Sequence, residues 1–86
     1  MQLQTIQDVL HTSPFRPFRL RTAGGKSIPV LHPEVALLSP KDNVIFLVRE
    51  QGRFYVLDPE SVTSVETAST PAEVEQLVKE ARSSLN

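Results

Sequence analysis

The stretch Asn43-Val44-Ile45-Phe46-Leu47-Val48-Arg49 decides the fold of this chain. It contains five apolar residues in succession, and turn-forming residues bound it on both sides. A run of this length, rich in β-branched and aromatic residues, predicts a strand that is buried on both faces. Other elements must then cover each face, and we expect Phe46 to be almost completely buried. The two faces should carry Val44, Phe46 and Val48 on one side and Ile45 and Leu47 on the other.

The composition is that of one soluble domain spanning residues 1–86. The chain has no cysteine, which excludes disulfides, thiolate metal sites and cysteine nucleophiles. Its longest apolar run is far shorter than the ~20 residues of a membrane helix, and its first residues lack the pattern of a signal peptide. The formal net charge of −1 gives no overall attraction to nucleic acid or to anionic lipid. We therefore expect a cytoplasmic protein without a membrane partner.

The residues before the central stretch predict a helix and a hairpin. Residues 2–11 have apolar side chains at helical spacing. Residues 17–22 alternate between apolar and basic side chains, which predicts a half-buried strand, and Gly24-Gly25 marks the turn that follows. Residues 26–31 then form the return strand. Because Pro29 lacks a backbone donor, this strand should lie at an edge of the sheet or carry a bulge at that position.

The residues on either side of the central stretch complete the predicted sheet. Residues 32–40 predict a single helical turn that His32 caps, with apolar side chains that plug the end of the sheet. Residues 53–57 and 61–66 predict two further strands. Short connections between all five strands favour an antiparallel meander.

The last segment, residues 70–85, is the clearest predicted helix. Thr70 is the expected N-cap, and Glu73 completes a capping box at the third helical position. This helix could cover the domain's own core or bind a partner. We therefore predict an α+β fold with an N-terminal helix, a five-stranded, strongly bent antiparallel sheet or small partial barrel over residues 17–66, and a C-terminal helix packed on it. The alternative is an open antiparallel sheet with both helices on one face.

Five short motifs follow the predicted N-terminal helix in a fixed order. They are Pro14-Phe15-Arg16-Pro17-Phe18-Arg19, Gly24-Gly25, His32-Pro33-Glu34, Leu38-Ser39-Pro40 and Phe54-Tyr55-Val56-Leu57-Asp58. This succession, over residues 3–66, resembles a group of small uncharacterised bacterial proteins, whose members usually have Asp-Gly where this chain has Gly24-Gly25 and whose pattern does not include the C-terminal helix. The resemblance implies no activity and no functional residue. One helix followed by five short strands also resembles the layout of Sm-like and SH3-like small barrels, which is a likeness of architecture alone.

Four basic side chains lie on or beside the predicted first hairpin: Arg16, Arg19, Arg21 and Lys26. Alternation places Arg19 and Arg21 on one face of their strand, opposite the core. If they are free of acidic partners, these side chains form a small surface for a nucleic-acid backbone or another anion. If carboxylates across the sheet pair with them, the same residues form an ordinary solvated strand face. Four charges would in either case support only weak, salt-sensitive binding.

The sequence contains no recognisable catalytic or cofactor motif. His11 and His32 lack the spacing of metal ligands, and the serines stand outside any nucleophile motif. We therefore predict that the chain is not an enzyme and binds no cofactor, metal or small-molecule substrate. The favoured function is a non-catalytic module that interacts with an unknown protein partner or with itself. A weak nucleic-acid-binding small barrel is the first alternative, and an enzyme with an unrecognised site is the second.

Overall fold

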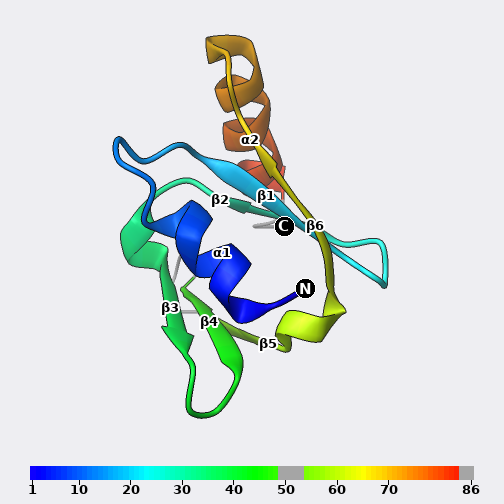
Figure 1. Cartoon of the computed structure of the whole chain (residues 1–86). Coiled ribbons are helices and arrows are strands. Elements are labelled where there is room, and N and C mark those ends of the chain that lie inside the picture. Colours follow the sequence, from blue (N-terminus) through cyan, green and yellow to red (C-terminus); the bar gives the residue numbers. More distant parts are fainter. Residues whose placement is uncertain (49–53, 84–86) are drawn as a thin grey trace.

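The computed structural model describes residues 1–48 and 54–83, which form an α+β fold of two layers of strands with two helices (Figure 1). The described elements are α1 (Leu3–Leu10), β1 (Phe18–Thr22), β2 (Ser27–Val30), η1 (Pro33–Val35), β3 (Ala36–Ser39), β4 (Val44–Val48), β5 (Phe54–Leu57), η3 (Pro59–Ser61), β6 (Val62–Thr67) and α2 (Pro71–Ser83). The strands form two antiparallel sheets. Sheet A has the order β2-β1-β6, and sheet B has the order β3-β4-β5. The predicted class is confirmed, whereas the predicted single five-stranded sheet is wrong.

The extra strand is β3, which lies inside the segment predicted as a helical turn. Pro33–Val35 does form a 3₁₀ turn, although the His32 side chain makes no capping hydrogen bond. Ala36–Ser39 then pairs along its whole length with β4, with Leu37 opposite Phe46. Alanine and leucine have little intrinsic preference for strands, so this strand exists because the edge of β4 is there to pair with it.

Sheet A is built around β1, which pairs with β2 on one side and β6 on the other. The alternation predicted for β1 is confirmed, because Phe18 and Leu20 are buried while Arg21 is exposed. Strand β2 is an edge strand, which is one of the two positions that Pro29 allows, since among the described strands it pairs with β1 alone. In the turn between them Gly25 has a φ of 85°, a left-handed conformation that glycine adopts without steric cost.

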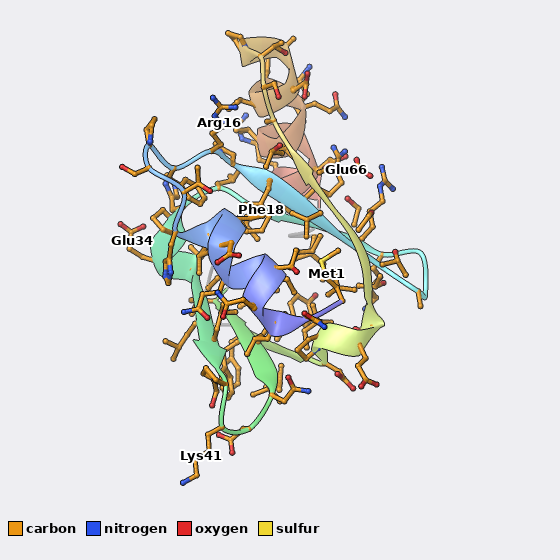
Figure 2. The ribbon with its side chains drawn as sticks, viewed as in Figure 1. Met1, Arg16, Phe18, Glu34, Lys41 and Glu66 are labelled. Carbon is orange, nitrogen blue, oxygen red and sulfur yellow. The ribbon has the colours of Figure 1, made fainter. Side chains whose placement is uncertain are left out.

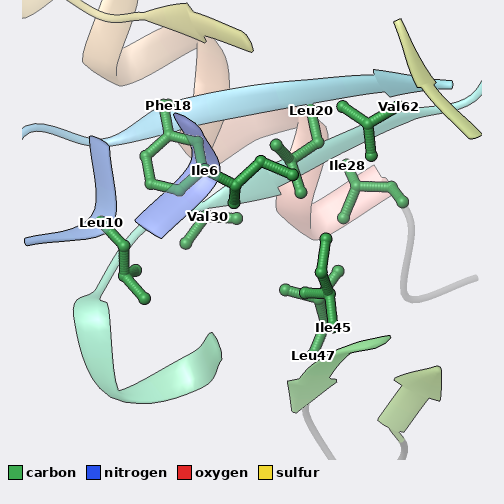
Figure 3. Packing of buried hydrophobic residues seen from close by; sticks show 9 residues of the cluster. All are labelled: Ile6, Leu10, Phe18, Leu20, Ile28, Val30, Ile45, Leu47 and Val62. Carbon is green, nitrogen blue, oxygen red and sulfur yellow. The ribbon is translucent and has the colours of Figure 1, made fainter. Parts of the chain in front are cut away.

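The core lies between the inner faces of the two sheets, and α1 contributes to it from the side (Figures 1 and 3). Its buried side chains come from every layer: Ile6, Leu10, Phe18, Leu20, Ile28, Val30, Ile45, Leu47 and Val62. Within the central strand β4, Ile45 and Leu47 are 0% and 1% exposed. Phe46 is only half-buried and Val48 is 54% exposed, so the prediction that Phe46 is a core residue is wrong. The described elements cover one face of this strand and leave the other open.

Helix α2 packs against the outer face of sheet A, where its Leu77 is 2% exposed. The predicted cap is confirmed, because the Glu73 amide donates to the Thr70 hydroxyl oxygen at 3.2 Å. The Glu73 carboxylate accepts from the Ser69 amide at 3.2 Å, one residue earlier than in the standard capping box. The predicted helix end at 85 lies outside the described residues. Neither α1 nor α2, the two described α-helices, has the length and apolar character to cross a membrane.

Candidate functional site

Two of the predicted basic residues are held in an ion-pair network on the outer face of sheet A. Arg19 donates from Nε and Nη2 to the two carboxylate oxygens of Glu80 in α2, at 2.9 and 2.7 Å. It also donates from Nη1 to Glu66 in β6 at 3.1 Å, and Arg21 donates from Nε to the same carboxylate at 2.5 Å. The Arg19 side chain is 15% exposed. Arg19 therefore ties sheet A to α2, and Arg19 and Arg21 share the carboxylate of Glu66.

The network shifts the protonation equilibria of its members in the direction that ion pairing requires. The hydrogen bond from Arg21, with a further one from Arg19, holds the pKa of Glu66 below its ordinary value of 4.5. The hydrogen bond to Glu80, with a smaller contribution from Glu66, raises the pKa of Arg19. Glu66 is exposed, so solvent screens much of this attraction. The network is an intramolecular clamp, and the condition for a free basic surface is not met at Arg19 and Arg21.

The other two predicted basic residues lie elsewhere. Arg16 is exposed and precedes β1, and Figure 2 shows it near the α2 end of the molecule. Lys26 follows the turn at the opposite end of β1, with its Nζ 5.8 Å from the centre of the Tyr55 ring. Five strand residues separate the two ends, a span of about 17 Å. The structure thus brings Arg19 and Arg21 together but leaves Arg16 and Lys26 apart from each other.

The histidines occupy unremarkable positions. His11 lies at the C-terminus of α1, where its backbone amide donates to the Gln7 carbonyl, and both His11 and His32 are exposed. Within residues 1–48 and 54–83, no group of three histidine, aspartate or glutamate side chains is arranged to hold a metal ion.

The feature that sequence reasoning missed is the outer face of sheet B. Strand pairing places its side chains in three cross-strand rows. These rows are Ser39 and Val44; Leu37, Phe46 and Val56; and Val48 and Phe54. We call these seven residues the apolar face. Four of them are more than half exposed: Leu37 at 66%, Val48 at 54%, Phe54 at 65% and Val56 at 57%. A monomeric soluble protein rarely leaves so continuous a group of large apolar side chains in water.

The described strands of sheet B carry no charged side chain. Its three strands read ALLS, VIFLV and FYVL. The ion pairs described above lie instead on sheet A and α2. Charged side chains and bulges are the usual devices that keep an exposed sheet from associating, and the strands of sheet B have neither within their described pairing.

A cleft opens between sheet B and the first hairpin. Its volume is about 470 Å³, and its lining combines apolar and polar groups from β2, β5 and η3. The lining residues are Thr22, Gly24, Lys26, Ser27, Ile28, Tyr55, Val56, Leu57 and Ser61. Among these lining residues, Lys26 is the one charged side chain. The cleft is therefore a weaker candidate for function than the apolar face.

Comparison with known proteins gives a fold but no family. No protein-family model matches the chain, and no curated protein matches it. A solved structure with a similar fold is the X-ray structure of a Northeast Structural Genomics Consortium target, with a TM-score of 0.52 and 20% identity. The match covers 64% of this chain and 95% of that chain. A likeness at this identity shows the fold alone. Its description names no activity, which agrees with the expected likeness to small uncharacterised proteins.

Proposed function

We propose that the chain is a non-catalytic protein-interaction module and that the apolar face of sheet B is its binding surface. The observation that carries this proposal is the exposure of Leu37, Val48, Phe54 and Val56 on one sheet face. Removing exposed apolar surface of this kind from water favours association by about 25 cal/mol for each Å² that the partner covers. A covered outer face would also give Phe46 the burial that its sequence context predicts.

The nucleic-acid alternative has less support. Its strongest residues are already paired, Arg19 with Glu66 and Glu80 and Arg21 with Glu66, so a phosphate would have to displace these carboxylates. The other two predicted basic residues, Arg16 and Lys26, lie at opposite ends of β1. We expect no retention of a labelled single-stranded oligonucleotide at about 50 mM salt, where phosphate contacts are strongest. Tight binding under these conditions would favour the alternative.

Site-specific photocrosslinking tests the proposal directly. A photoreactive phenylalanine analogue replaces Phe54 on the apolar face, and in a matched control it replaces the exposed Ala72 on α2. Irradiation of living bacterial cells that produce each variant should give a covalent protein adduct from position 54 and none from position 72. The adduct should disappear when Val56→Lys is added, because a buried lysine without a partner opposes association. Equal adducts from both positions, or none from position 54, would refute the proposed binding surface.

A further inference from the structure

We infer that the partner of the apolar face is the same face of a second copy of this chain, which gives a symmetric dimer with sheet B packed on sheet B. This inference rests on the proposed function, because it names the occupant of the same surface. Two sheets that pack face to face lie about 10 Å apart with their side chains interleaved. The central row of Leu37, Phe46 and Val56 would then form the middle of the interface.

The chemistry of the apolar face is self-complementary. In a two-fold interface each residue meets a surface identical to its own, so any charge tends to confront a like charge. The three strands of sheet B carry no charge that could do so. Six of the seven side chains of the apolar face are aliphatic or aromatic and need no hydrogen-bond partner, and the seventh, Ser39, already donates to Asp42 at 3.0 Å. A second copy therefore leaves no polar side chain of this face unpaired.

The distribution of charge on the rest of the molecule favours the same arrangement. The Arg19, Arg21, Glu66 and Glu80 network lies on the outer face of sheet A, under α2. The core separates this network from the apolar face. In the dimer the layers would run α2, sheet A, sheet B, and then the same in reverse, so that both networks remain in water. The charged side chains of this network, which a strongly charged partner would contact, lie on the outer face of sheet A and not on the apolar face.

The exposed area is sufficient for a weak dimer. A fully exposed aliphatic or aromatic residue offers about 150–200 Å², and the four most exposed members of the apolar face are on average about 60% exposed, which gives about 400 Å² per copy. The half-buried Val44 and Phe46 bring this to about 450–500 Å². Two copies would bury about 1,000 Å² in total, which is the lower limit for a specific interface. We expect a dissociation constant on the order of 10 µM.

Sedimentation velocity over a range from about 1 µM to about 1 mM protein tests the dimer. The weight-average mass of the wild type should rise from the 9.6 kDa of one chain to twice that value. Val56→Lys should weaken dimerisation on the order of 100-fold, so that this variant stays mostly monomeric up to about 100 µM protein, where the wild type is mostly dimeric. It should keep its circular dichroism and melting temperature at low concentration. Thr63→Lys is the matched control, because it adds the same charge at an exposed strand position of sheet A. This variant should dimerise as the wild type does.

The results of sedimentation and photocrosslinking distinguish failure of the dimer from failure of the proposed interaction function. A wild type that remains monomeric at every concentration overturns the dimer. If photocrosslinking at position 54 then captures a different protein in a manner that Val56→Lys abolishes, the interaction function stands with another partner. If it captures nothing, both proposals fail. A dimer that Val56→Lys leaves intact uses some other surface, and this result also overturns the inference.

Discussion

The most informative perturbation compares two neighbours on the central strand that point to opposite faces. Leu47 is 1% exposed in the core, whereas Val48 is 54% exposed on the apolar face. Leu47→Ala removes buried carbons and leaves a cavity, which should lower the free energy of unfolding by about 2–5 kcal/mol. Val48→Ala removes two methyl groups that are only about half covered, which should cost about 0.8 kcal/mol.

Urea denaturation followed by far-ultraviolet circular dichroism measures both effects. With a slope of about 1 kcal/mol per M urea for a domain of this size, the midpoint should fall by about 3 M for Leu47→Ala and by less than about 1 M for Val48→Ala. The measurements belong at about 2 µM protein, where association contributes little, and should be repeated at about 50 µM. Ile45→Val, a milder change in the same core, provides a second buried variant if Leu47→Ala does not fold. Equal destabilisation by Leu47→Ala and Val48→Ala at low concentration would show that both faces of the strand are covered within one chain.

Three further predictions concern α2 and its ion pairs. Thr70→Ala removes the acceptor of the Glu73 amide and should cost about 1 kcal/mol in a thermal melt, with an unchanged melt contradicting the cap. Leu77→Ala should lower the free energy of unfolding by about 2–5 kcal/mol. Hydrogen exchange of this variant should be faster for α2 amides than for β1 amides, and equal protection of both would contradict docking of α2 as a separate layer. Because the pKa of Glu66 is lowered in the folded state, its stabilisation is present above the ordinary value of 4.5 and is lost as pH falls through the lowered value. The stability of Glu66→Gln should therefore fall below that of the wild type at neutral pH and converge with it in acid, and a constant difference at all pH values would contradict the ion pairing.

The elements that the sequence predicted correctly are those whose signals are local. The Thr70 cap, the alternation of β1 and the edge position that Pro29 allows each follow from a few adjacent residues. Strand β3 was missed because its residues carry no strand signal of their own and are held by β4. The face assignment within β4 was right in its alternation but wrong in its burial. A continuous apolar run shows that neither face of the strand carries a charge. It does not show whether each face is covered by other residues of the same chain.

The candidate sites divide in the same way. Alternation correctly placed Arg19 and Arg21 on the outer face of β1, and the sequence reasoning allowed that carboxylates could pair with them. It could not find Glu80, because this partner stands 61 residues away on a helix whose docking depends on tertiary packing. The apolar face was not predicted, because Leu37 was expected to close the end of the sheet and Phe54 and Val56 were expected to belong to an ordinary strand. Their absence of charge was visible in the sequence, and only the pairing of β3, β4 and β5 shows that they form one surface.

The order of pairing along the chain has a consequence for how the protein folds. Sheet B consists of adjacent strands, so its contacts close short loops and should form early. Sheet A is complete only when β6 reaches β1, which brings Phe18 beside Thr67 across most of the chain. During this interval a nascent chain would present to the cell both surfaces of a meander whose described strands are apolar and carry no charge. We expect the yield of soluble protein to depend on how quickly β6 arrives, and chaperones that bind extended apolar segments should recognise β4 before any mature partner does.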